Sequence, residues 1–302
     1  MACEGLGAAA PILAFSLEDA PQQAAGFFTS ESLGDAFQHL ASRRKAHIMR
    51  AVKTMASIQR ISPEERHRLF GLLNDRSASD AFVAYYALEH PADRVVIHGY
   101  FSGGKGPSGF MVVAQTGMDL FRPIAVPFVA TPTSLHQLLR ASLQPQRPVL
   151  LYLPLEQREW AEQLLDFQGG QVAELMRLDP RAYEPMINVL VRESSSPLGT
   201  PRYEIQSRSG ASAATGVNWQ GQRYAEVYLQ ADEEAQTRGL ALSVLAAISS
   251  RLLREHTIPL FRHDESSLIR LSSLERLGFR GTGSRTFIAQ ALINDPQTEA
   301  EK

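Results

Sequence analysis

EVYLQADEEAQTRGLALSVLAAISSRLLREHTIPLF, residues 226–261, is the stretch that decides the fold. It reads as a β-strand, a short polar loop and then a long helix that opens near Gly239. The first-turn amides of such a helix lack partners within the helix, and its dipole favours an anion. Gly239 permits close backbone approach, and Ala241 keeps the next turn thin. The stretch therefore predicts a phosphate-binding loop, to which Arg238 would add charge; a plain tight turn at Gly239 is the alternative.

Strands and helices alternate on both sides of the turn-rich segment ESSSPLGTP at 193–201. After this segment we expect strands at 203–208, 213–219, 224–230, 258–262 and 285–292, with helices at 237–255 and 266–277. Gly278 stands where a left-handed helix cap belongs. Before the segment we expect strands at 95–101, 110–115, 120–130, 149–153, 172–178 and 186–192. The helices expected there begin at a Ser62 capping box, span 77–89, run from a Thr133 cap to 143, and span 156–167 up to Gly169-Gly170.

Both halves thus follow the same order of elements, which predicts an α+β (layered α/β) fold of two lobes. Each lobe would be a mixed, mostly antiparallel sheet flanked by helices. We expect an arm or mobile tail at 1–30, a helical segment plus a degenerate lobe at 31–192, and a cofactor-binding lobe at 193–302. The helical segment has an apolar stripe from Leu33 to Met55 and a basic opposite face. Packing on a core and docking on an anionic surface both remain open for this helix.

The two motifs of the second half resemble those of the GNAT superfamily of acyl-CoA-dependent N-acyltransferases. The family signature Arg/Gln-x-x-Gly-x-Gly/Ala is matched by Gln236, Gly239 and Ala241. A later helix in the family ends in Leu-Gly-Phe, as do residues 277–279 here. The resemblance covers about residues 202–292 and implies two GNAT-like lobes, of which only the second keeps the cofactor motif.

The resemblance also implies how acetyl-CoA, as co-substrate, would bind. In the family, the strand before the loop splays from its neighbour and holds the acyl-pantetheine arm. By position, Leu229, Gln230 and Ala231 would face the pantetheine. The residues that would face the pyrophosphate are Gln236, Thr237, Arg238, Gly239, Leu240 and Ala241.

The positions of the family's catalytic residues match less well than the loop motif does. Many members have an Asn at the start of the later helix and a Tyr within it that serves as general acid. At these positions this chain has Ser267 and Leu274. Ser266, Ser267 or Tyr228 would have to replace that acid. Glu226 occupies a strand position where the family often places its general base; an ordinary strand carboxylate is the alternative. His263, followed by Asp264 and Glu265, offers either a second base near the cleft or a surface turn.

Composition bounds the remaining classes. The 302 residues, 44% hydrophobic and 21% charged, suit a globular chain of about two domains. A net charge of −2 and the single Cys3 argue against a dedicated nucleic-acid binder and exclude a disulfide framework within the chain. No metal-ligand spacing, basic leader or long apolar run is present, so we expect a cytoplasmic protein without membrane or metal.

The function expected from these observations is transfer of an acetyl group from acetyl-CoA to a small-molecule or peptide amine. The alternative is a non-catalytic acyl-CoA-binding or regulatory protein with the same fold. Whether the chain forms a homodimer is left open by the sequence.

Overall fold

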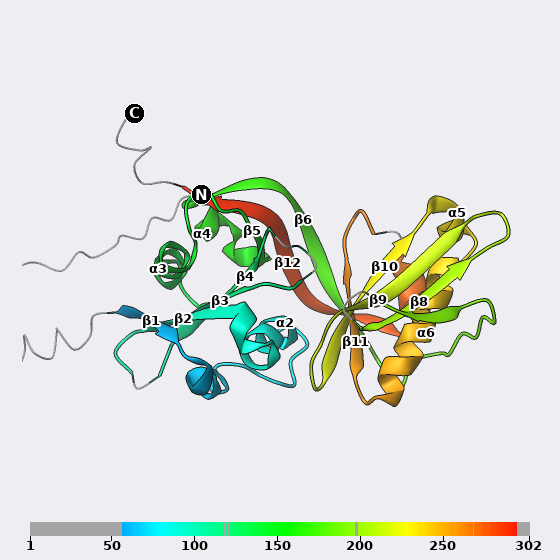
Figure 1. The fold of residues 1–302 in the computed structure, drawn as a ribbon, viewed down its shortest axis with the longest axis horizontal. Helices are drawn as coiled ribbons and strands as arrows, with labels where there is room; N and C mark the ends of the chain where they lie inside the picture. The colour runs from blue at the N-terminus through cyan, green and yellow to red at the C-terminus, as the bar shows by residue number, and fades with distance from the viewer. Residues whose placement is uncertain are drawn as a thin grey trace, which may run out of the picture. The chain divides into compact units, whose positions relative to one another are not determined.

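The computed structural model describes residues 56–294 apart from 105, 118, 120, 197, 198 and 268. The arm expected at 1–30 and the helix expected at 33–55 lie outside the described residues. Within the described range the strands form one 12-stranded sheet in the order β1-β2-β3-β4-β5-β12-β6-β11-β10-β9-β8-β7 (Figure 1). The sheet divides naturally into two lobes that meet at β6 and β12.

The first lobe is built by the elements that precede β6. Its strands are β1 Ser57–Ile61, β2 Val95–Phe101, β3 Gly109–Ala114, β4 Ile124–Phe128 and β5 Val149–Pro154. Its helices are η1 Pro63–Leu69, α2 Ala81–Ala84, η2 Tyr85–Glu89, η3 Ala92–Arg94, α3 Pro132–Ser142, η4 Leu155–Gln157 and α4 Arg158–Glu162. The Ser62 capping box is present at η1, where the Glu65 side chain accepts a hydrogen bond from the Ser62 amide.

The second lobe is built by the elements between β6 and β12. Its strands are β7 Arg192–Ser195, β8 Pro201–Gln206, β9 Ser212–Gln220, β10 Tyr224–Ala231 and β11 Ile258–His263. Its helices are α5 Glu233–Thr237, α6 Leu240–Arg254 and α7 Leu271–Leu277. Gly278 caps α7 with φ of 106°, the left-handed conformation that the sequence predicted.

Two long strands are shared by the lobes, β6 Leu165–Leu178 and β12 Phe279–Ile293. The last part of β12, residues 286–291, lies between β5 and β6 in the first lobe. Residues 174–177 of β6 lie between β11 and the first part of β12 in the second lobe. Each lobe therefore receives half a strand from the other, as the green and red ribbons show in Figure 1.

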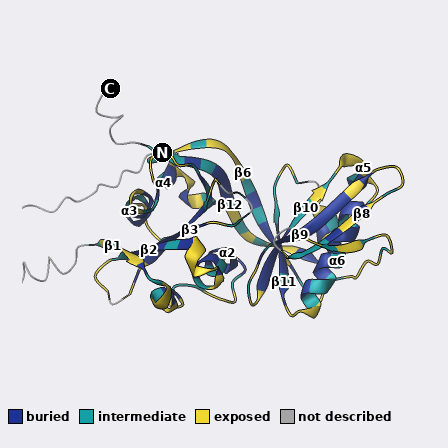
Figure 2. Ribbon diagram, in the orientation of Figure 1, coloured by how far each residue is buried: buried dark blue, intermediate teal, exposed yellow. Residues whose placement is uncertain are grey.

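Three clusters of buried side chains support this sheet. In the first lobe, α3 and α4 cover one face, and η1, α2 and η2 cover the other. The cluster beneath η1, α2 and η2 extends to Trp219, Tyr224 and Leu260 of the second lobe. The helices α6 and α7 cover the second lobe's other face, and both contribute buried residues to its core (α6 is labelled in Figure 2). Away from the first lobe, the opposite face of β8 to β10 stays open: Glu204, Gln206 and Gln230 are exposed.

Several expected elements differ from the structure. The helix expected at 156–167 is wrong: it ends at Glu162, and Gly169-Gly170 lie inside β6, where both have positive φ. The strand expected at 186–192 is also absent, since β7 begins only at Arg192. The N-cap of α3 is Thr131, not Thr133, because the Thr131 side chain accepts from the Ser134 amide. The helix expected from 266 starts at Leu271.

No helix within the described ranges is long and apolar enough to cross a membrane.

Candidate functional site

Strand β10 follows β11 only briefly before the two diverge. Their parallel pairing runs from Tyr224–Ile258 to Glu226–Leu260, and among the described residues it stops there. The register between β10 and β9 shifts at this point: Glu226 pairs with Trp219 and Val227 with Val217, so Asn218 of β9 is the extra residue of a β-bulge, which increases the local twist. From Val227 onward β10 is paired with β9 alone, so one of its edges faces the opening between the strands. The predicted pantetheine contacts Leu229, Gln230 and Ala231 all lie on this divergent half.

The loop after β10 contains a short helix that the sequence did not predict. Asp232 caps α5 by accepting from the Ala235 amide at 2.7 Å, and it also accepts from the Ser212 amide at 2.6 Å. These two hydrogen bonds hold the pKa of the Asp232 carboxyl below its usual value. Asp232 therefore links the loop both to α5 and to the neighbouring strand β9.

Gly239 is the N-cap of α6 and has φ of 71° in the left-handed region. A Cβ at this position would meet no atom within 4 Å, so conformation, not space, favours glycine. The amides of Leu240, Ala241 and Leu242 open the helix and have no acceptor within the described part of the chain. Three donors at the positive end of a 15-residue helix are thus available to an anion.

Gly239, Ala241 and Leu242 border a cavity of about 450 Å³ between the loop and α7. The residues that line it are Gln236, Thr237, Gly239, Ala241, Leu242, Ile269, Arg270, Ser273 and Arg276. Arg270 and Arg276 are exposed cations, and neither has a carboxylate within ion-pair distance among the described residues. Arg238 instead turns to Glu234 at 3.0 Å and Ser209 at 2.6 Å, away from this lining. The positive charge at this cavity therefore comes from Arg270 and Arg276, and not from Arg238 as the sequence suggested.

Sequence reasoning missed Arg270, Ser273 and Arg276 because they follow the loop by about thirty residues of chain. Their only signal was the Leu-Gly-Phe motif, which fixed the register of the helix that carries them. The motif does not say which side of a seven-residue helix faces the loop.

Glu226 is buried at the point where β10 and β11 separate. Its carboxylate accepts from the Arg262 Nε at 2.9 Å, the Asn218 amide nitrogen at 3.0 Å and the Trp219 indole at 3.2 Å. The guanidinium of Arg262 also donates to the Thr286 hydroxyl at 2.9 Å. The predicted base therefore stands at the narrow end of the opening, with three donors already on its two oxygens.

Aromatic rings of the first lobe surround this ion pair. The Arg262 guanidinium carbon lies 4.7 Å from the Phe82 ring centre and 5.4 Å from that of Tyr152. Burial, together with the charge of Glu226, raises the pKa of Tyr152 to about 12. Arg262 is a second residue that sequence reasoning missed, since nothing in its strand marks it as the partner of Glu226.

The second polar cluster, after β11, forms a compact turn. The His263 Nε2 lies 3.1 Å from the Ile269 carbonyl oxygen. The hydroxyls of Ser266 and Ser267 donate to the Asp264 carboxylate at 2.9 and 3.1 Å. Leu274, at the position of the family's acid, is fully buried in the core.

Tyr228 points to the other side of β10 from the α6 core. Its hydroxyl accepts from the Arg202 guanidinium at 3.2 Å. Of the three replacements suggested for the missing acid, Tyr228 alone lies on the divergent strand itself.

The first lobe repeats the divergence but not the loop. Strands β4 and β5 pair only at Ile124–Leu150 and Ala125–Leu151. At the start of α3, Thr131 already satisfies the Ser134 amide and Pro132 contributes no amide hydrogen. The Gln157 side chain donates to the Val129 carbonyl at 2.9 Å in the same turn. This helix start thus offers an anion fewer donors than α6 does.

Comparison with known proteins places this fold. No protein-family model matches the chain, and no curated protein matches its sequence. Many solved structures are similar to it, and three of them each have a TM-score of 0.51. A tandem GNAT protein from the clavulanic acid biosynthesis pathway is 11% identical, over 80% of this chain and 99% of that one. A GCN5-related N-acetyltransferase from Sphaerobacter thermophilus is 10% identical, over 78% and 95%.

The third structure, a Drosophila protein, is 17% identical over 77% of this chain and 97% of that one. At these identities the likeness concerns the fold. The match to a tandem GNAT protein agrees with the two lobes. The described part of this chain therefore has the GNAT fold in a tandem arrangement.

Proposed function

We propose that the protein is an acyl-CoA-dependent N-acyltransferase that moves an acetyl group from acetyl-CoA to an amine. The observation that carries the proposal is the combination at the end of β10: an opened strand edge, then three helix amides beside two arginines, none of which has a partner among the described residues. Opened strand edges suit the amide groups of a pantetheine arm, and the amides and arginines suit its phosphates.

The donor would follow β10 from the cavity toward the bulge. Its diphosphate would meet the amides of residues 240–242 and the side chains of Arg270 and Arg276. Its pantetheine would pass Leu229, Gln230 and Ala231, as the family resemblance implies. The thioester would then reach the region of Glu226, where β10 and β11 meet.

Transfer at that point needs few groups of the protein. The amine nitrogen attacks the thioester carbonyl, the C–N bond forms, the C–S bond breaks, and the thiolate leaves with coenzyme A. The amine's proton must pass to a base, for which Glu226 remains the proposed residue. Holding both reactants in place supplies much of the acceleration in such a direct transfer. The Tyr228 hydroxyl is the proposed proton source for the thiolate, since Leu274 has no proton to give.

A second candidate function is binding of acyl-CoA without turnover. It is favoured by the three donors that occupy Glu226 and by the apolar residue at the usual acid position. Calorimetry and a thiol-release assay separate the two functions. Acetyl-CoA that binds but releases no coenzyme A with any amine of a broad panel would favour the second.

Gly239→Val tests the placement of the donor. Valine is strained at φ of 71°, by about 1–3 kcal/mol, and its side chain would stand at the mouth of the cavity. We expect acetyl-CoA to bind about tenfold or more weakly, measured by calorimetry. Gly169→Val is the matched control, because Gly169 has φ of 69° and equally empty surroundings in the first lobe. Equal acetyl-CoA affinity of both variants and the wild type would refute the placement.

A further inference from the structure

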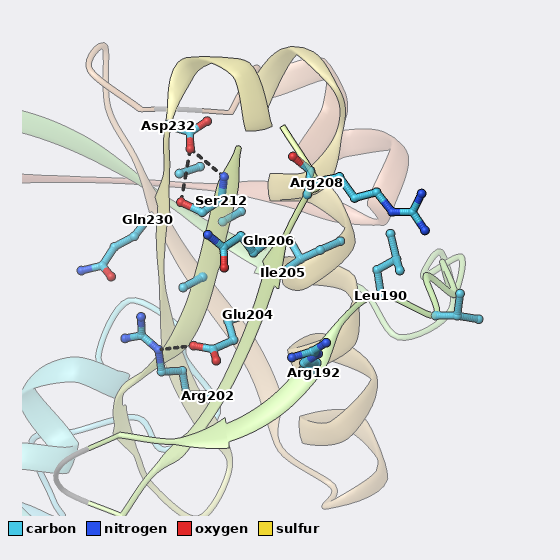
Figure 3. Close-up of a pocket in the computed structure, with 15 residues that line it drawn as sticks. Leu190, Arg192, Arg202, Glu204, Ile205, Gln206, Arg208, Ser212, Gln230 and Asp232 are labelled. Atoms are coloured by element: carbon cyan, nitrogen blue, oxygen red, sulfur yellow. Dashed lines mark hydrogen bonds and ion pairs between the residues drawn. The ribbon is translucent and has the colours of Figure 1, made fainter. Parts of the chain in front are cut away.

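A groove runs along the open face of the second lobe. Its floor is the middle strand β9, which places Ser212, Ala214 and Gly216 on that face in alternate positions. Strands β8 and β10 form its walls, with larger side chains opposite each small one (Figure 3). The resulting cavity measures about 850 Å³, within the usual range of roughly 300–1,000 Å³ for small-molecule sites.

Arg202 lines the groove and contacts a tyrosine just beyond it. In one row across the sheet stand Arg202, Gly216 and Tyr228, and the phenol leans over the glycine to meet the guanidinium at 3.2 Å. A Cβ on Gly216 would lie only 2.5 Å from the Tyr228 hydroxyl oxygen, so this arrangement depends on glycine. The next rows hold Glu204 with Gln230, then Gln206.

The charge of the groove is positive within a chain of net charge −2. Its lining has three arginines, at 192, 202 and 208, and two carboxylates, Glu204 and Asp232. Asp232 is saturated by the amides of Ser212 and Ala235 and by the Ser212 hydroxyl. Glu204 lies 3.6 Å from the Arg202 Nε, and no ion pair joins it to Arg192 among the described residues (Figure 3). Positive charge is therefore left for a ligand.

The end of the groove at Arg202 lies toward the proposed site of transfer. On β10, Glu226, Tyr228 and Gln230 alternate on the same face, and their Cα atoms are spaced at about 6.5 Å along the strand. Tyr228 thus separates the groove from Glu226. A ligand in the groove would have one end at Arg202, whose guanidinium contacts the Tyr228 hydroxyl.

We infer that this groove holds the acceptor, and that the acceptor is a small molecule with a carboxylate in addition to its amine. The inference rests on the proposed function. The amine lies toward Tyr228 and Glu226, and the carboxylate pairs with Arg202 and Arg192. Arginine binds carboxylates with charge-assisted, often paired hydrogen bonds, so both charge and geometry select this class over neutral amines.

The test compares pairs of acceptors that differ only in the carboxylate. Coenzyme A release from acetyl-CoA is measured with each amino acid and with the corresponding amino acid amide. We expect kcat/KM to be at least about tenfold higher for the acids, although the amides have the more easily deprotonated amine. Arg192→Gln and Arg202→Gln should each remove most of this preference and leave the acetyl-CoA dissociation constant within about twofold. Arg158→Gln, which alters an ion-paired surface arginine of α4, should leave the preference intact.

Ala214→Leu provides a variant that leaves every charge in place. A larger side chain on the groove floor should raise KM for the acids about tenfold and leave acetyl-CoA binding unchanged. Saturation-transfer NMR with N-acetylated amino acids then tests the groove without turnover, since these compounds are the expected products. Contact signals that Ala214→Leu abolishes would support the groove even if no coenzyme A were released.

The outcomes distinguish this inference from the proposed function. Amides used as well as acids, or product signals unaffected by Ala214→Leu, would overturn the inference. Acetyl-CoA that does not bind at all would overturn the proposed function and leave the NMR result to decide the groove.

Discussion

At the residue scale, the pair formed by Glu226 and Arg262 has two roles that need to be separated. Glu226 is buried and Arg262 is partly buried, and removal of one partner from a buried pair typically costs about 3–5 kcal/mol of stability. A loss of activity on mutation could therefore reflect a loss of folding. Substitutions that keep the shape of the carboxylate are needed to isolate its chemistry.

Glu226→Gln should lower turnover by roughly 10²–10⁴ if Glu226 is the base, because an amide cannot accept the amine's proton. The loss should shrink at high pH, where the free amine needs no base. Turnover at several pH values and the free energy of unfolding would both be measured. Trp219→Phe is the control: it removes one donor from the carboxylate and keeps a large ring, so turnover should stay within a few-fold. A wild-type rate for Glu226→Gln would direct attention to His263.

At the element scale, two helices that occupy equivalent places begin differently. Helix α6 begins with a left-handed glycine and three free amides, whereas α3 begins with a threonine cap and a proline. Charge-assisted hydrogen bonds to amides contribute about 1.5–3 kcal/mol each, so two fewer donors amount to at least a hundredfold in affinity.

We therefore expect one acetyl-CoA site per chain, measured as the stoichiometry of a calorimetric titration. Substitutions at 131–134 should leave the titration unchanged, and Gly239→Val should weaken its single site. Two sites of similar affinity, one of them abolished by changes at 131–134, would show that the first lobe also binds the donor.

The same scale shows what the sequence could and could not predict. Strands β2 and β5 and the cap at Gly278 follow from local patterns of apolar residues and turn residues, and they were predicted closely. Gly169-Gly170 suggested the end of a helix, but they lie in β6 because pairing with β12, over a hundred residues away, determines that segment. The loop motif predicted the helix start at Gly239 for the same local reason. The partners of Glu226 and the groove arise from contacts between strands, which no local pattern records.

At the scale of the whole molecule, each lobe contains half of a strand from the other, so the stability of one lobe depends on the other. Residues 174–177 of β6 lie between β11 and β12, so the second half of the chain lacks an internal strand of its own lobe. Phe287, Ala289 and Ala291 of β12 are buried in the first lobe in the same way. A boundary drawn at 192–193 therefore divides the chain at a point where the strands of each lobe still depend on the other part of the chain.

We expect a fragment of residues 193–302 to be unable to fold by itself, because it leaves β11 without its neighbour. Circular dichroism should show no cooperative thermal transition for this fragment. Co-expression with residues 54–192 should restore both the transition and acetyl-CoA binding. A fragment that melts cooperatively alone would contradict this view of the sheet.

The shared strands also have an internal symmetry. The antiparallel pairs Ala173–Thr286 and Glu174–Arg285 lie near the middle of the β6–β12 pairing, and from them the two strands run in opposite directions, each into the other's lobe. Such a contact is self-complementary in the same sense as the interface of a two-fold dimer. A shorter ancestor with a single lobe and one long final strand would be able to build this sheet from two copies. Gene fusion of those copies would produce the present connectivity without any strand having to change its neighbours.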